Sequence, residues 1–247
     1  MHWVVQQGVL KPANFDLLVA ALERAEVRHS IVAVPRGESR LVPEVSPSGK
    51  VMVCGALKMA QIARERGWSP GSFLNENFEH SVWAEALAGE LLNVAGRVAR
   101  LGDVSLECDS FVRPAADNKA FDGRVFRSSE FEAWKVDNPS LLKLPALVAP
   151  PITIYSEFRL FMIGGKVVTG SQYMRGGSPH LSDSPDPEVV EYAEAVSSRW
   201  RPADAFVVDV ARTVGGCKVI EFNNINSSGF YASDVGRYVH AMEAAFG

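Results

Sequence analysis

The sequence lacks the features that direct a chain to a membrane or to nucleic acid. Its 247 residues contain no apolar run near the ~18 residues that a membrane span needs. The N-terminus, MHWVVQQG, has no basic segment followed by a hydrophobic one, so no signal peptide is expected. The formal net charge is -4 and the lysines and arginines are scattered, which is unlike a nucleic-acid-binding surface. We therefore expect a cytoplasmic protein without membrane or nucleic-acid partners.

Cysteine is scarce, and several common catalytic motifs are absent. Cys54, Cys108 and Cys217 are odd in number, far apart and set in apolar surroundings, which favours reduced core thiols over disulfides or zinc ligands. We find no G-x-x-x-x-G-K-[ST], G-x-S-x-G, H-E-x-x-H or C-x-x-C. The usual signatures of P-loop enzymes, serine hydrolases, zinc proteases and thiol oxidoreductases are therefore missing.

The composition, 47% hydrophobic and 22% charged, is typical of a globular protein with one large domain or two small ones. The first part of the chain alternates strands and helices, as in a small α/β unit. Asn14 is expected to cap its first helix. The strands are predicted at 3–6, 29–34 and 51–54, and the helices at 15–25 and 55–66.

Two apolar strands near the C-terminus each contain one carboxylate. Asp209 lies among valines, and Glu221 lies among Val219, Ile220 and Phe222. Each acid could simply occupy the solvated face of a half-buried strand. However, Asn223 and further short oxygen-bearing residues follow Glu221 directly. Such a run favours an oxygen-ligand site for a hard cation such as magnesium, and a positive group is expected near any buried carboxylate.

The turn between these strands decides whether the two acids meet. A two-residue loop at Gly215 and Gly216 would place Asp209 and Glu221 on opposite faces of the sheet. A three-residue loop of 214–216, with Gly216 in the left-handed conformation, would pair Thr213 with Cys217 and bring Asp209 opposite Glu221. The second register is predicted.

Basic residues mark a second candidate region. A short strand ends at Arg113, and the loop 115–123 (AADNKAFDG) contains Lys119. Small residues let backbone N–H groups approach an anion, so this segment suits a flap over phosphate groups. An ordinary basic surface hairpin is the alternative. Farther on, the run 146–149 is bounded by prolines and predicts an exposed connecting strand whose backbone meets a nucleobase.

A glycine-turn hairpin follows. Strands 156–163 and 166–173 are joined at Gly164-Gly165, and Arg159 projects from the first strand beside a carboxylate. A surface ion pair of little energetic value is the alternative role for Arg159. The stretch 174–187, which contains Arg175, reads as a long glycine-, serine- and proline-rich loop.

Together these segments resemble ATP-grasp enzymes. The residues that carry the resemblance are R113-P, K119-A-F-D-G, E157-F-R159, the G-G hairpin, D209 and E221-F-N223, in that order. The chain is most similar to the small ATP-grasp clade in which an arginine, here Arg113, replaces the first nucleotide-binding lysine. The resemblance implies an α+β fold in which two α+β subdomains (residues 73–247) clasp ATP, preceded by an α/β domain (residues 1–72) that helps to form the acceptor site.

The resemblance also implies roles for the residues. Asp209, Glu221 and Asn223 would hold one or two magnesium ions. Arg113 and Lys119 would contact the α- and β-phosphates of ATP. The remaining roles fall to two groups: Arg159 and Arg175 would neutralise charge on the acyl phosphate or the transferred group, and Ala146, Leu147 and Val148 would lie against the adenine.

The function that the resemblance implies is an ADP-forming ligase that joins a carboxylate to an amine through an acyl phosphate. The acceptor would be a small molecule, an amino acid, a peptide or a protein. Two alternatives keep the same ATP site: a kinase that phosphorylates a hydroxyl, and a nucleotide-binding regulatory module without turnover.

Overall fold

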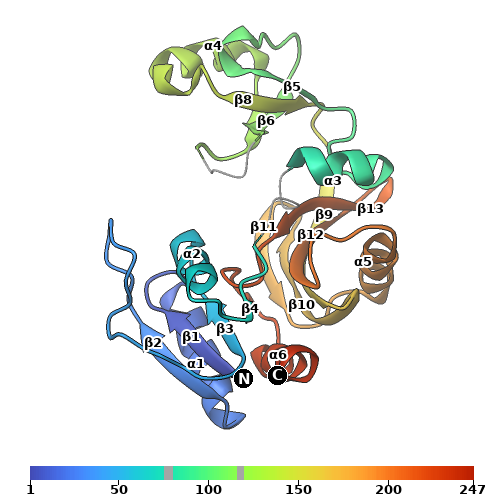
Figure 1. Ribbon diagram of the computed structural model, residues 1–247. Helices are drawn as coiled ribbons and strands as arrows, with labels where there is room; N and C mark the ends of the chain where they lie inside the picture. The colour runs from blue at the N-terminus through green and yellow to red at the C-terminus, as the bar shows by residue number, and fades with distance from the viewer. Residues whose placement is uncertain (75–79, 116–119) are drawn as a thin grey trace.

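The computed structural model describes residues 1–74, 80–115 and 120–247 and contains three β-sheets (Figure 1). The mixture of helices with parallel and antiparallel strands confirms the α+β prediction. None of the helices in the described part of the chain has the length and apolarity that a membrane span requires.

The N-terminal sheet is parallel, with the strand order β2-β1-β3-β4. Its central strands β1 and β3 are almost continuously apolar and buried, as expected where both faces of a parallel sheet are covered. This unit contains β1 (His2–Gln6), α1 (Pro12–Arg24), β2 (Arg28–Val32), β3 (Val51–Cys54), α2 (Leu57–Glu65) and β4 (Pro70–Gly71).

The predicted cap of the first helix is wrong. Helix α1 begins at Pro12, whose fixed φ suits the first turn of a helix. The side-chain oxygen of Asn14 instead accepts a hydrogen bond from the backbone N–H of Phe230, far along the chain. Asn14 therefore connects the N-terminal unit to the segment before the last helix.

A second sheet, which we call the small sheet, stands apart at the top of Figure 1. It is antiparallel, with the order β5-β8-β6-β7, and one face packs on α4. The unit follows α3 (His80–Ala86) and η2 (Ala88–Glu90). It contains β5 (Arg97–Arg100), η3 (Leu101–Asp103), β6 (Ser110–Pro114), β7 (Arg124–Phe126), α4 (Ser128–Asp137), η4 (Pro139–Leu141) and β8 (Pro145–Ala149).

The prediction of an exposed connecting strand at 146–149 is wrong. This segment is β8, an internal strand hydrogen-bonded to β5 on one side and β6 on the other, and its four residues are buried. The preceding proline is compatible with an internal strand because it occupies the first position, where its missing N–H costs least.

The third sheet, which we call the central sheet, is antiparallel with the order β11-β10-β9-β12-β13. Helix α5 covers one face, where Val189, Ala193 and Val196 pack against Phe158 and Leu160. Helix α6 covers part of the other face. The unit contains β9 (Ile154–Ile163), β10 (Lys166–Arg175), β11 (Ser178–Ser182), α5 (Pro187–Arg199), β12 (Ala205–Thr213), β13 (Gly216–Asn223) and α6 (Val235–Phe246).

The glycine turn at Gly164-Gly165 is confirmed, but the long loop predicted over 174–187 is wrong in its first half. Strand β10 continues to Arg175, turns at Gly176 and Gly177 and returns as β11. Both glycines have positive φ, +55° and +77°, as a two-residue hairpin turn of the primed type requires. The second glycine pair is therefore another hairpin signal.

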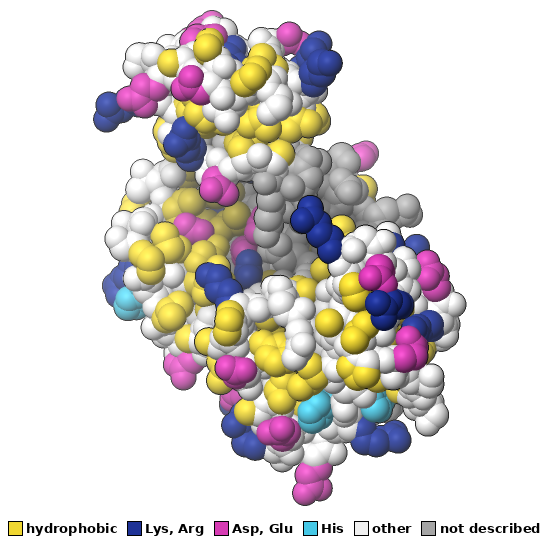
Figure 2. All heavy atoms as spheres, turned by 90° about the vertical axis from the view of Figure 1, so that its left-hand side faces the viewer, with side chains coloured by type: hydrophobic (Ala, Val, Ile, Leu, Met, Phe, Trp, Pro, Cys, Tyr) yellow, Lys and Arg dark blue, Asp and Glu magenta, His cyan; other side chains and the backbone are white. Residues whose placement is uncertain are grey.

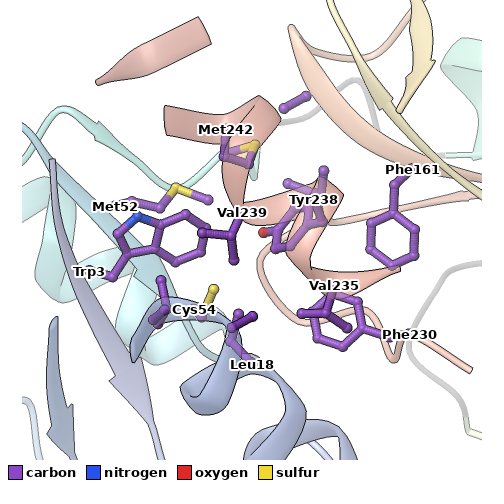
Figure 3. Packing of buried hydrophobic residues seen from close by; sticks show 14 of the residues in the cluster. Trp3, Leu18, Met52, Cys54, Phe161, Phe230, Val235, Tyr238, Val239 and Met242 are labelled. Atoms are coloured by element: carbon purple, nitrogen blue, oxygen red, sulfur yellow. The ribbon is translucent and has the colours of Figure 1, made fainter. Parts of the chain in front are cut away.

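The largest hydrophobic core joins the N-terminal unit to the central sheet (Figure 3). Trp3 and Leu18 of the N-terminal unit meet Tyr238 and Met242 of α6, and Phe161 of β9 closes the cluster. These side chains are at most 2% exposed, so the two parts pack as one body. The division into domains 1–72 and 73–247 stays a prediction.

Candidate active site

The two acids of the C-terminal hairpin lie directly opposite each other, as predicted. In the register of β12 and β13, Asp209 pairs with Glu221. The reason differs from the prediction, because Thr213 pairs with Gly216 across a two-residue loop and the extra residue is Ile220, in a bulge beside Asp209. Gly216 has φ +89°, in the left-handed region that glycine tolerates. The bulge restores the register that the shorter loop would have shifted.

The counter-charge of Asp209 is Arg159. Strand β9 places Arg159 opposite Asp209 on the other side of β12. The guanidinium grips the carboxylate at two points: Nε donates to Oδ1 at 2.9 Å, and Nη2 donates to Oδ2 at 2.7 Å. The side chains are 13% and 3% exposed, so this is a buried, bidentate ion pair rather than the surface pair weighed as an alternative.

Burial raises the pKa of Asp209 to about 6; Arg159 opposes this shift, and the neighbouring Glu221 adds to it. The raised pKa reflects two carboxylates that share one counter-ion.

Asn223 bridges the two acids. Its amide Nδ2 donates to Glu221 Oε1 at 3.0 Å and lies 3.4 Å from Asp209 Oδ2. The three residues predicted as metal ligands therefore converge on the same face of the central sheet, next to Arg159.

A cavity of about 760 Å³ separates this face from the small sheet. Arg113 and Pro114 of β6 enter it from one side, and Glu157 and Glu221 enter it from the other. Figure 2 shows the hollow between the upper lobe, which is the small-sheet unit, and the body below it, with hydrophobic side chains on the underside of the lobe. Its apolar lining includes Leu92, Phe111, Val125, Ile152, Ile154 and Ile220.

The other predicted site residues lie at varying distances from this cavity. Leu147 pairs with Arg113 and shares its sheet face, whereas Ala146 and Val148 pack in the core on the α4 side. Arg175 is exposed at the end of β10. Lys119 lies outside the described residues.

Sequence reasoning missed an aromatic pair beside the ion pair. Tyr173 of β10 and Tyr231 stack with ring centroids 4.7 Å apart and an interplanar angle of 10°. The Tyr173 hydroxyl donates to Glu157 Oε2 at 2.8 Å, and the Arg159 guanidinium carbon lies 5.0 Å from the centre of the Tyr231 ring. The phrase Gly170-Ser171-Gln172-Tyr173 was the one signal near it, and it carried no role.

Two antiparallel sheets that face each other across a cavity, with paired acids on one and an arginine on the other, define the ATP-grasp class of fold. The chain belongs to an ATP-grasp domain family, described as family 3 of its clade, whose model matches residues 37–242. No curated protein matched the chain.

Solved structures with the same fold confirm the architecture. D-cycloserine synthetase DcsG is 15% identical with a TM-score of 0.67, and 98% of each chain is covered. A RimK domain ATP-grasp protein from Sphaerobacter thermophilus is 15% identical, covers 92% of each chain and has a TM-score of 0.65. D-alanine–D-alanine ligase from Bacillus anthracis complexed with ATP is 11% identical, covers 99% of each chain and has a TM-score of 0.65.

Proposed function

We propose that the protein is an ATP-dependent, ADP-forming ligase that activates a carboxylate as an acyl phosphate and joins it to an amine. The observation that carries the proposal is the row of Arg159, Asp209, Glu221 and Asn223 beside the cavity that Arg113 enters from the opposite sheet. This arrangement concentrates groups for phosphate and for a hard cation at one end of a cavity with an apolar remainder. A nucleoside triphosphate has that division between base and phosphates.

The donor set fits magnesium. Asp209 and Glu221 supply carboxylate oxygens, and a turn of the Asn223 amide presents its Oδ1 in place of Nδ2. Among the described residues no three His, Cys, Asp or Glu side chains gather, so phosphate oxygens and water would complete the shell. Bound magnesium would neutralise charge on the outer phosphates.

The arginines divide the remaining charge. We assign Arg113 and Lys119 to the α- and β-phosphates, and Arg159, together with Arg175, to the transferred phosphoryl group. Arg159 is already held in place before substrate binds, which is the preorganisation that electrostatic catalysis requires. We place the adenine in the apolar part of the cavity, against the β8 strand that holds Ala146, Leu147 and Val148.

We propose an amino acid or a peptide as acceptor. This is supported by proteins of the same fold: ATP-grasp ligase PsnB has been solved with its precursor peptide PsnA2, at 12% identity, 99% and 96% coverage and a TM-score of 0.63. D-alanine–D-alanine ligase and D-cycloserine synthetase also share the fold. Each of these names an amino-acid or peptide compound.

The test is nucleotide analysis with labelled ATP, magnesium, a panel of carboxylates and hydroxylamine. ADP that forms only with a carboxylate, together with a trapped hydroxamate, is the expected result. AMP as the main product would contradict the mechanism, and ADP with a phosphorylated hydroxyl compound would establish a kinase. A protein that binds ATP without turnover throughout the panel would be the regulatory module.

Lys119→Ala should weaken nucleotide binding and slow turnover, each by roughly tenfold, because a phosphate contact acts in both the ground state and the transition state. The nucleotide Kd and kcat are measured separately. Lys143→Ala, which removes an exposed lysine elsewhere in the same unit, is the matched control. Wild-type values for both quantities in Lys119→Ala would remove Lys119 from the site.

Magnesium affinity should depend on pH below about 6. The pKa of Asp209 is about 6, and the protonated carboxyl is a poor ligand, so the proton competes with the metal. The apparent magnesium affinity should fall about tenfold per pH unit below this value and level off above it. Magnesium titrations of ATP turnover at pH 5, 6 and 7 measure this, and equal affinity at all three would contradict the assignment of Asp209.

A further inference from the structure

We propose that Tyr231 is a positioning residue that holds the Arg159 guanidinium in its working orientation, and that the N-terminal unit sets Tyr231 through Asn14. The inference rests on the proposed function for its kinetic consequence, and on the contacts around Arg159 for its structural one.

The contacts of Arg159 show what holds it and what does not. Asp209 grips one edge of the guanidinium through Nε and Nη2. The remaining nitrogen, Nη1, has only a long contact of 3.5 Å to the carbonyl oxygen of Gly229. If Asp209 also binds magnesium, its oxygens are shared, and the grip on Arg159 loosens when ATP arrives. A second restraint that leaves the outer edge of the guanidinium free for a phosphoryl oxygen would keep its orientation.

Tyr231 supplies such a restraint. Its ring lies over the guanidinium, with the Arg159 carbon 5.0 Å from the ring centre, and a cation–π contact fixes the plane of the cation without using its N–H groups. The ring is itself held by its parallel stack on Tyr173, which is fixed in turn by the hydrogen bond to Glu157.

The backbone of Tyr231 shows that its position is imposed by its surroundings. Its φ is +52°, in the left-handed region that a bulky residue rarely adopts. Such a conformation persists only where neighbouring contacts over-determine it. Two of these contacts flank it directly: the Phe230 N–H donates to Asn14 Oδ1, and the Ala232 N–H donates to Ser171 Oγ at 3.2 Å.

The anchor at Phe230 gives the N-terminal unit control over the site. The Phe230 ring is buried in the core shared by α1, α6 and β9, stacked on Phe161 with centroids 5.3 Å apart (Figure 3). Asn14 of α1 fixes its backbone from the other side. A change at Asn14 should therefore reach Arg159 through Phe230 and Tyr231.

The kinetic test compares Tyr231→Leu with Tyr231→Phe, which keeps the ring. Tyr231→Leu should lower kcat roughly tenfold or more with little change in the ATP Kd, as for residues that orient a group in contact with substrate, and Tyr231→Phe should restore it. Tyr155→Leu, which removes another half-exposed tyrosine, is the matched control and should match wild type. A higher KM at constant kcat in Tyr231→Leu would make Tyr231 a binding residue and overturn the proposal.

A spectroscopic test is independent of turnover. In the ligand-free protein labelled with ¹⁵N, the Arg159 Nε–H proton should be shifted upfield by the Tyr231 ring. The shift should persist in Tyr231→Phe and disappear in Tyr231→Leu. An unchanged resonance in Tyr231→Leu would overturn the proposal even if the protein proves to be a ligase, whereas the expected loss would uphold it even if the wild type has no ligase activity.

The coupling to the N-terminal unit has its own pair of variants. Asn14→Asp keeps an oxygen that can accept from the Phe230 N–H, and Asn14→Leu removes it. Asn14→Leu should reduce the Arg159 Nε–H shift and Asn14→Asp should retain it. Wild-type spectra for both would confine the positioning role to Tyr231 and overturn the link to Asn14.

Discussion

Glu221→Gln is expected to lower magnesium-dependent ATP turnover by about 10³-fold, since one preorganised electrostatic contact to a developing charge is worth that much. The substitution keeps the shape of the side chain and removes one carboxylate from the predicted metal site. Glu221 is only partly buried, and its printed partner is the Asn223 amide, which glutamine can also contact. The fold should therefore remain.

The comparison that isolates the effect is Glu191→Gln, at an exposed position on α5. Both variants should unfold at the wild-type temperature, and only Glu221→Gln should lose turnover and magnesium dependence. Wild-type turnover in Glu221→Gln would exclude this site, and equal losses in the two variants would point to a cause other than the metal ligand.

Asp209→Asn is expected to abolish turnover and also to lower the free energy of unfolding by about 3–5 kcal/mol, the usual cost of removing one partner of a buried ion pair. The Arg159 side chain is 13% exposed and would keep its charge without a counter-ion. Chemical denaturation at pH 7 measures the loss, with the fold checked by circular dichroism.

The double variant Asp209→Leu/Arg159→Met separates the two effects of Asp209. Replacing both members of a buried pair by apolar residues is often nearly neutral, so most of the lost stability should return while turnover stays absent. If Asp209→Asn unfolds like wild type, the pair does not contribute to stability in the way the geometry indicates. If the double variant is as unstable as the single one, the unpaired charge is not the cause.

Several features of the site are readable from local sequence. A carboxylate inside each of two valine- and isoleucine-rich runs predicts paired acids, and Asn223 directly after them predicts further oxygen ligands. The pairing of Asp209 with Glu221 was predicted correctly from the wrong turn, because a bulge at Ile220 and a three-residue loop both add one residue to the register. Side-chain period alone does not distinguish the two.

The features that escaped prediction depend on contacts between distant segments. Arg159 and Asp209 are 50 positions apart, and only the pairing of β9 with β12 makes them partners. Asn14 has the residue type of a helix cap, but its tertiary contact to Phe230 takes precedence. The run 146–149 resembles an exposed edge because of its flanking prolines, and only the neighbouring strands β5 and β6 bury it.

The most direct test of the acyl-phosphate ligase is to follow the carboxylate oxygen. In the proposed reaction a carboxylate oxygen attacks the γ-phosphorus, the bond to the β–γ bridging oxygen breaks, and ADP leaves. The amine then attacks the acyl carbon and displaces phosphate that carries the carboxylate oxygen.

The measurement uses a panel of amino acids labelled with ¹⁸O in the carboxylate, hydroxylamine as the amine, ATP and magnesium. The isotope content of the phosphate is then determined by ³¹P NMR or mass spectrometry. The account predicts one ¹⁸O atom in each phosphate released, together with unlabelled ADP. Unlabelled phosphate, or ¹⁸O recovered in AMP, would contradict it.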